Sequence, residues 1–289
     1  MLMMREFGLF ASIGRLASLG VLVVMGVLAR PTWADGLPDV KSKSAVVIDA
    51  ETGEEIFGKN ADAIRSIAST TKIFVAMAVR AKGLDLDGWT EITKGDAYVA
   101  RGGSRTRLDI GVRFRNRDLL RAMLVASDNR APTALGRAAG MNPDELVAAM
   151  NHIARDLELT HTKITDPTGL RGNVSTAREM AIALRAALDD DVLRAIMGDD
   201  SDTVIGQGGR PKIEYATTNR PLAERQWDVI GGKTGYTEAA GYCYVTAAII
   251  AHRQVVMAFY GAEGKQTRFA DFNRVAAWLD AAHGDAAAK

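Results

Sequence analysis

The order of apolar and polar positions predicts β-strands at both ends of the chain. Near the N-terminus, apolar-rich runs at 45–48 and 55–57 flank the turn signal Glu51-Thr52-Gly53, a pattern typical of a hairpin. Near the C-terminus, three more strand candidates follow one another through short connections, at 229–237, 241–252 and 254–261. Short connections make consecutive strands antiparallel neighbours.

Helical patterns dominate the region between these strands. A helix is predicted after Asn142, because this capping residue is followed by Pro143 and two acidic residues. Thr176 and Glu179 have the spacing of a capping box at the start of the next helix. A last helix follows the final strand, with apolar residues at helical spacing: Phe269, Phe272, Val275, Ala276 and Leu279. The pattern predicts a mixed α and β fold, in which distant segments close a five-stranded antiparallel sheet around an inserted helical region.

The first 34 residues differ in character from the rest. Arg5 and Arg15 accompany a 14-residue apolar run at 16–29, and the small residues Thr32 and Ala34 follow it. This arrangement is typical of a secretory signal peptide cleaved after Ala34. The alternative is a retained membrane anchor, but the run is shorter than the roughly 20 residues that a spanning helix needs.

Charge gives no reason to expect nucleic acid as a partner. Cleavage after residue 34 leaves 33 basic and 34 acidic residues, so the mature chain is nearly neutral. Seven arginines between Arg101 and Arg121 form a local exception. Because Asp109 and Asp118 interleave with them, we interpret this stretch as a solvated loop and a helix start; a site for an anionic polymer is the alternative.

Cysteine and histidine usage argues against disulfide and metal chemistry. Cys243 is the only cysteine, so no intramolecular disulfide can form, and its strand-like surroundings predict a small buried residue. The four histidines show no ligand spacing with one another. We therefore expect no metal site and no cofactor, and a zinc hydrolase is poorly supported.

Three short strings carry the candidate chemistry: Ser69-Thr70-Thr71-Lys72, Ser127-Asp128-Asn129 and Lys233-Thr234-Gly235. Each is weak alone, but in this order and separation they match the S-x-x-K, S-D-N and K-T-G set of penicillin-recognising serine enzymes. The combination indicates an enzyme that forms an acyl intermediate on serine and uses lysine as its base.

The first string supplies a nucleophile and a base. Residues three apart at a helix start share one face, so Ser69 and Lys72 are predicted to lie together. A serine hydroxyl needs a base to remove its proton, and Lys72 can do so only when neutral. We expect burial and the charge of Lys233 to lower the pKa of Lys72. The alternative is that Ser69 merely caps a helix and Lys72 is a surface charge.

The other strings are expected to complete the site. Ser127 relays a proton to the leaving amine and Asn129 orients Lys72 and the substrate amide, although both residues also suit a helix cap. Lys233 and Thr234 hold a substrate carboxylate, and Gly235 leaves room for the acyl group. The main-chain N–H groups of Ser69 and Tyr236 form the oxyanion hole, typically worth about 3 kcal/mol per donor.

Beyond these strings, the resemblance to a known family extends over residues 44–280. With the segments at 166–170, 173–177, 233–237 and 239–243, the chain closely resembles the low-molecular-mass penicillin-binding proteins. Within the D-alanyl-D-alanine carboxypeptidase family it is most similar to the D-Ala-D-Ala endopeptidase branch. The resemblance implies a DD-peptidase/β-lactamase-like fold. It also implies a periplasmic serine DD-peptidase that cleaves peptidoglycan stem peptides and is inhibited covalently by β-lactam antibiotics.

Two departures qualify the resemblance. The sequence ends about where the family's catalytic domain ends, so we expect no stable membrane anchor after signal cleavage. The loop that carries a deacylating glutamate in class A β-lactamases reads Asp166-Pro167-Thr168-Gly169-Leu170 here, so rapid β-lactam hydrolysis is not expected. The predicted organisation is a signal peptide at 1–34, a catalytic domain at 35–281 and a flexible tail at 282–289.

The three strings do not distinguish carboxypeptidase from endopeptidase action. Arg268, just before the last helix, either holds a free C-terminal carboxylate or is an exposed arginine of the first turn. Two other functions stay open at this point: a serine β-lactamase on the same fold, and a catalytically silent wall-binding protein.

Overall fold

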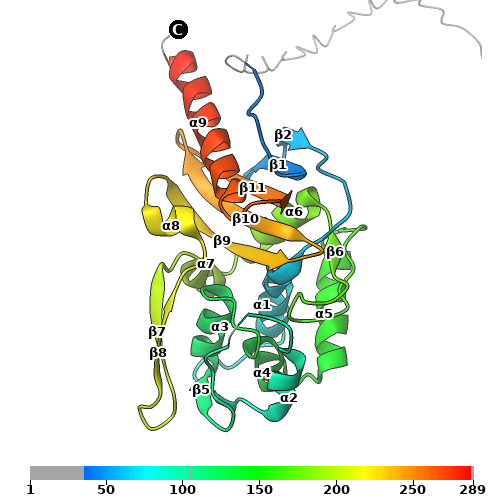
Figure 1. Cartoon of the computed structure of the whole chain (residues 1–289), viewed down its shortest axis with the longest axis vertical. Helices are drawn as coiled ribbons and strands as arrows, with labels where there is room; N and C mark the ends of the chain where they lie inside the picture. The colour runs from blue at the N-terminus through cyan, green and yellow to red at the C-terminus, as the bar shows by residue number, and fades with distance from the viewer. Residues whose placement is uncertain (1–35, 105, 288–289) are drawn as a thin grey trace, which may run out of the picture. The chain divides into compact units, whose positions relative to one another are not determined.

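A five-stranded antiparallel sheet forms the centre of the fold (Figure 1). The computed structural model describes residues 36–104 and 106–287, so the predicted signal peptide lies outside the described residues. The sheet order is β2-β1-β11-β10-β9, with β9 at one edge. Its members are β1 (Ser44–Asp49), β2 (Glu55–Lys59), β9 (Asp228–Thr237), β10 (Gly241–Ile250) and β11 (Arg253–Ala262). Pairing of β1 with β11 joins the two ends of the chain, which confirms the predicted closure.

Both faces of the sheet are buried, which explains the continuous apolar run of β1. Side chains alternate between the faces of a strand. Accordingly, Val46 and Ile48 belong to the core shared with the helical region, whereas Ala45 and Val47 pack in the cluster formed with α9 (Thr267–Ala287). Figure 1 shows α9 on one side of the sheet and α6 (Ala177–Ala187) on the other.

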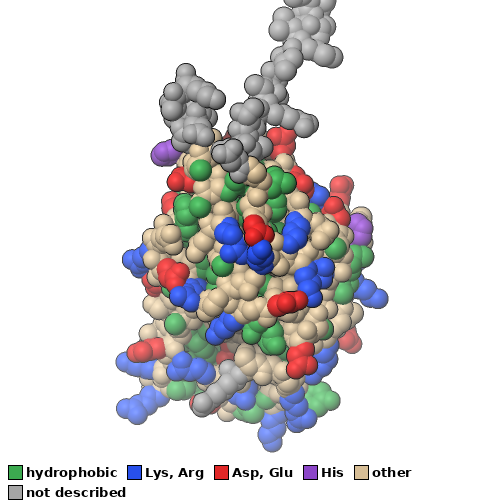
Figure 2. Space-filling view, turned by 45° about the horizontal axis from the view of Figure 1, so that its top comes forward, with side chains coloured by type: hydrophobic (Ala, Val, Ile, Leu, Met, Phe, Trp, Pro, Cys, Tyr) green, Lys and Arg blue, Asp and Glu red, His purple; other side chains and the backbone are tan. Residues whose placement is uncertain are grey.

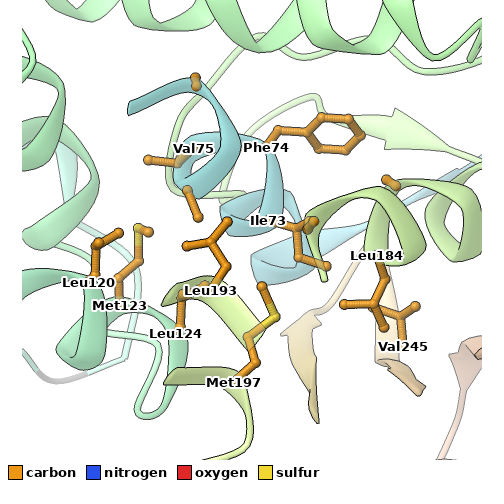
Figure 3. Close-up of a cluster of buried hydrophobic side chains, with 14 of the residues drawn as sticks. Ile73, Phe74, Val75, Leu120, Met123, Leu124, Leu184, Leu193, Met197 and Val245 are labelled. Atoms are coloured by element: carbon orange, nitrogen blue, oxygen red, sulfur yellow. The ribbon is translucent and has the colours of Figure 1, made fainter. Parts of the chain in front are cut away.

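The helical region surrounds α1 (Lys72–Ala81), an almost wholly buried helix. Figure 3 shows Ile73, Phe74 and Val75 of this helix among apolar side chains of its neighbours. The remaining helices are α2 (Lys94–Val99), α3 (Asn116–Leu124), α4 (Ala131–Ala138), α5 (Pro143–Asp156), α7 (Asp191–Met197) and α8 (Arg220–Glu224). Burial of α1 on all sides fixes the position of its first residue, Lys72, relative to the sheet.

The two predicted helix caps behave differently. Asn142 and Glu145 form a complete capping box at α5. At α6, Thr176 accepts a hydrogen bond from the N–H of Glu179 at 3.1 Å. The Glu179 carboxylate instead accepts from the N–H of His161 at 2.8 Å, so only half of that predicted box forms.

Several short elements lie where the sequence pattern predicted mainly helix. They are the hairpin of β7 (Ser201–Ile205) and β8 (Lys212–Ala216), and the two-stranded pairs β3 (Arg65–Ser66) with β6 (Val174–Ser175) and β4 (Trp89–Glu91) with β5 (Arg113–Arg115). The hairpin escaped prediction because only Val204, Ile213 and Tyr215 of its strands are buried.

The described residues of the arginine-rich stretch, 101–104 and 106–121, form loop, the strand β5 and the start of α3, so one unpredicted strand precedes the helix start. Figure 2 shows acidic and basic side chains interspersed over one face, in keeping with the nearly neutral composition. At the other end of the chain, α9 continues to Ala287, beyond the domain boundary expected at residue 281. Within the described ranges, no helix has the length and hydropathy needed to cross a membrane.

Candidate active site

Ser69 and Lys72 lie together at the entrance of α1. Ser69 sits in the 3-10 turn η1 (Ala68–Thr71), and Lys72 is the first residue of α1. Lys72 Nζ donates a hydrogen bond to Ser69 Oγ at 2.8 Å, which confirms the predicted shared face. Neither helix start is capped by a side chain, so the alternative that Ser69 serves only as a helix cap is wrong.

Lys72 is held by three oxygen atoms inside the protein. Besides Ser69 Oγ, its Nζ contacts Asn129 Oδ1 and the main-chain oxygen of Thr168, each at 2.7 Å. The side chain is completely buried, so the alternative of a surface charge is wrong. These contacts fix the amine beside the hydroxyl that it is expected to deprotonate.

Burial gives Lys72 the protonation behaviour of a base. It lowers the pKa of Lys72 to about 7, although Asp166 and Asp128 favour the charged form. The expected repulsion between Lys72 and Lys233 is present in the structure, where it acts on the pKa of Lys233. Burial lowers the pKa of Lys233, and repulsion from Lys72 and Arg268 lowers it further. A lysine with a pKa near 7 is neutral often enough to accept a proton.

The second string forms a loop between α3 and α4, as the interrupted helical pattern predicted. This loop, residues 125–130, is called the SDN loop below. Ser127 has a φ of +62°, an uncommon conformation for a residue other than glycine. No side chain caps α4, so the helix-cap alternative for Ser127 and Asn129 is wrong at this position.

The third string lies on the edge strand β9, directly against Ser69. A Cβ atom on Gly235 would come within 2.9 Å of the Ser69 main-chain nitrogen, so only glycine lets the strand approach this closely. Thr234 Oγ1 donates to Thr218 Oγ1 at 2.7 Å, and the buried Lys233 Nζ donates to the Thr234 carbonyl at 2.9 Å. An edge strand has unpaired main-chain groups, to which an extended peptide can add as a further strand.

One cleft of 1230 Å³ connects the three strings. Six of the eight predicted site residues line it: Ser69, Ser127, Asn129, Thr234, Gly235 and Tyr236. The other two, Lys72 and Lys233, are buried. The structure therefore brings segments from α1, the SDN loop and β9 around a single hydroxyl.

Arg268 also lines this cleft and is not the exposed arginine considered as an alternative. It is only 5% exposed, and its Nη1 donates to the carbonyls of Gly235 at 2.8 Å and Cys243 at 3.1 Å. A guanidinium beside β9 remains suited to hold a carboxylate, which stays a prediction. No three His, Cys, Asp or Glu side chains of the described residues are grouped so as to hold a metal ion.

Comparison with known proteins identifies the family. Residues 32–264 match the peptidase S11 model, described as D-alanyl-D-alanine carboxypeptidase. The chain belongs to this family. It is 33% identical over 258 residues to a D-alanyl-D-alanine endopeptidase of Pseudomonas aeruginosa, covering 88% of this chain and 83% of that one. A D-alanyl-D-alanine endopeptidase of Escherichia coli is 30% identical over 245 residues, covering 84% and 78%.

Solved structures agree with this assignment. The Streptomyces K15 DD-transpeptidase superposes with a TM-score of 0.78 at 26% identity, covering 85% of this chain and 99% of that one. The predicted DD-peptidase fold is thereby confirmed, and this S11 peptidase is a serine hydrolase of the D-alanyl-D-alanine peptidase type.

A residue of this peptidase that the sequence did not single out is Thr168, whose carbonyl is the third partner of Lys72. Its loop is held by Asp166, whose Oδ2 accepts from Thr168 Oγ1 and from the N–H of Leu170, both at 2.7 Å. Because a main-chain carbonyl binds Lys72, the identity of the side chain at position 168 gave no direct signal in the sequence. The adjoining Gly169 has a φ of +84°, and a Cβ there would lie 2.1 Å from the Ala68 carbonyl oxygen.

We expect Gly169→Ala to displace this loop from Ser69 and Lys72. The added methyl group meets a main-chain oxygen that cannot move without moving Ser69. Acylation by a fluorescent penicillin should fall at least tenfold, and the free energy of unfolding should fall by about 1–3 kcal/mol because of the strain. Gly208→Ala is the matched control, because Gly208 has a similar φ of +82° and open space around it. Equal acylation by both variants would contradict the expectation.

Proposed function

We propose that this peptidase cleaves the D-Ala-D-Ala bonds of peptidoglycan stem peptides through an acyl-enzyme on Ser69. The observation that carries the proposal is the 2.8 Å hydrogen bond between Lys72 Nζ and Ser69 Oγ, formed by a fully buried amine whose pKa is lowered to about 7. A histidine is not needed, since the lysine is both close to the hydroxyl and able to become neutral.

In this mechanism, Lys72 takes the hydroxyl proton while Ser69 Oγ bonds to the carbonyl carbon of the penultimate D-Ala. The main-chain N–H groups of Ser69 and Tyr236 stabilise the resulting oxyanion. Ser127 passes the proton to the departing amine as the peptide bond breaks. Water then attacks the ester, which releases the peptide and restores Ser69.

The charge around the cleft supports a substrate with free carboxylates. Five basic side chains line it against a single acidic one, Glu238; they belong to Arg101, Arg171, Arg220, Lys265 and Arg268. Within the described residues, Arg101 and Lys265 form no ion pair, so their charge is free to act on a ligand. A positive cleft favours anionic peptides over neutral ones. We assign Lys233, Thr234 and Arg268 to the carboxylate next to the scissile bond.

β-Lactam antibiotics are expected to act as covalent inhibitors rather than as substrates. The only carboxylate of the 166–170 segment belongs to Asp166, which is buried and accepts hydrogen bonds from within its own loop. It is therefore poorly placed to activate a deacylating water. Repeated nitrocefin turnover by one enzyme molecule would favour the β-lactamase alternative instead.

The location that fits this substrate is the periplasm. The signal-peptide pattern of residues 1–34 supports export, and the stem peptides of the cell wall lie outside the cytoplasm. Fractionation of cells that produce the full chain, with N-terminal sequencing of the exported protein, tests the predicted cleavage after Ala34.

Purified stem peptides test the substrate. We expect the wild-type protein to split cross-linked muropeptide dimers faster than it releases D-Ala from monomeric pentapeptides, since relatives at 33% and 30% identity are endopeptidases. The two substrates are digested side by side and the products weighed by mass spectrometry. Faster release of D-Ala would favour a carboxypeptidase, and no cleavage of either would favour a catalytically silent protein.

A further inference from the structure

The β7–β8 hairpin reaches the SDN loop through one buried polar side chain. Tyr215, on β8, is 5% exposed, and its hydroxyl donates a hydrogen bond to Asp128 Oδ2 at 3.0 Å across 87 residues of sequence. The other two buried residues of these strands, Val204 and Ile213, are apolar. Packing alone would not require a hydroxyl here, so this contact calls for a functional explanation.

Asp128 connects the parts of the SDN loop. Its side chain is buried, and it accepts hydrogen bonds from the N–H groups of Arg107 at 2.9 Å and Arg130 at 3.0 Å as well as from Tyr215. A buried carboxylate depends on such donors, because each one lost leaves charge unsolvated. The neighbouring Ser127, with a φ of +62°, keeps its conformation only while these surroundings hold it.

The residue after Asp128 contacts the catalytic base. Asn129 Oδ1 accepts from Lys72 Nζ at 2.7 Å, so a shift of the loop backbone moves a partner of the amine. We propose that Tyr215 is a positioning residue of the reaction: its hydroxyl fixes Asp128, and Asp128 fixes Asn129 against Lys72 and Ser127 in the cleft. This inference rests on the proposed function.

The chemistry of Tyr215 suits a permanent donor. Burial and the negative charge of Asp128 raise the pKa of Tyr215 above the ordinary range of a tyrosine, so the phenol keeps its proton at neutral pH. The Arg107 guanidinium lies 5.4 Å from the ring centre and stacks over it. The ring is thus held on one side by a cation while its hydroxyl points to the carboxylate.

A second contact from the same segment supports this role. The N–H of Thr218 donates to the Val125 carbonyl at 3.1 Å, and Thr218 Oγ1 accepts from Thr234 Oγ1 at 2.7 Å. Residues 215–218 therefore contact both the SDN loop and the strand that carries Lys233-Thr234-Gly235. The hairpin and the residues directly after it therefore fix the SDN loop and β9 relative to each other.

Saturation kinetics with a fluorescent penicillin test the inference on Tyr215→Phe, which removes only the hydroxyl. We expect the limiting acylation rate to fall about tenfold, the loss expected of one hydrogen bond to a charged group, with an unchanged non-covalent dissociation constant. Tyr98→Phe is the matched control, because Tyr98 is 65% exposed and outside the cleft lining. Circular dichroism sets a temperature at which every variant is folded.

A double-mutant cycle separates positioning from general support of the fold. If Tyr215 acts through Asp128, the variant carrying both Tyr215→Phe and Asp128→Asn should acylate no more slowly than Asp128→Asn alone. Independent, multiplying losses would overturn the inference, as would a Tyr215→Phe acylation rate equal to that of Tyr98→Phe. A wild-type protein that penicillin does not acylate would overturn the proposed function, and this inference with it.

Discussion

Ser69→Ala is expected to abolish both peptide cleavage and covalent labelling by penicillin. Ser69 Oγ is the hydroxyl that Lys72 Nζ contacts, and no other group is proposed to form the ester. The substitution should leave the fold intact, because the Ser69 side chain caps neither η1 nor α1. Gel fluorescence after incubation with a fluorescent penicillin measures the labelling, and intact-protein mass spectrometry measures the mass of the adduct.

Ser104→Ala is the control for this loss. Ser104 lines the same cleft and is exposed, yet the mechanism gives it no role. It should be labelled as completely as the wild type. Stoichiometric labelling of Ser69→Ala would place the nucleophile on another residue and refute the acyl-enzyme assignment.

Much of this site could be predicted because its side chains follow local rules. A spacing of three residues at a helix start brings Ser69 and Lys72 to one face, and the structure places their reactive atoms 2.8 Å apart. Apolar runs and short connections predicted a sheet closed by distant segments, and the pairing of β1 with β11 confirms this closure. Where both faces of a sheet are buried, as at β1, the signal is a short continuous apolar run bounded by turn residues.

What the sequence did not reveal depends on main-chain atoms and on long-range contacts. The Thr168 carbonyl binds Lys72 without any side-chain signature. Tyr215 meets Asp128 across 87 residues, on a hairpin whose strands are mostly exposed and so show little apolar pattern. The sequence left Arg268 open between a carboxylate-binding residue and an exposed one, because the β9 and β10 carbonyls that it binds come together only in the folded chain.

The same limit applies to the cause of the lowered pKa of Lys72. Sequence reasoning identified that a neutral lysine is required and attributed its lowered pKa to burial and to the charge of Lys233, without showing how complete the burial is. In the structure, complete burial is the cause, and it prevails over Asp166 and Asp128. Burial depends on how α1, the SDN loop and the 166–173 loop close around the amine, which no single string specifies.

Lys72→Ala should lower the acylation rate by about 10²–10⁴-fold, the usual contribution of a general base. The wild-type rate should rise with pH through about 7 and then level off, because below its pKa Lys72 carries the proton and cannot accept one from Ser69. The variant should lose this inflection. Stopped-flow acylation from pH 5 to pH 9 measures both effects.

Lys82→Ala provides the matched comparison, since Lys82 is an exposed residue at the opposite end of α1. It should keep both the wild-type rate and the inflection near pH 7. If Lys72→Ala retained that inflection, the titrating group would lie elsewhere. A wild-type rate that still rose steeply well above pH 7 would instead mean that Lys72 remains charged in its pocket, because the protonated amine has no lone pair with which to activate Ser69. Since burial is the stated cause of the low pKa, either result would contradict the mechanism at its first proton transfer.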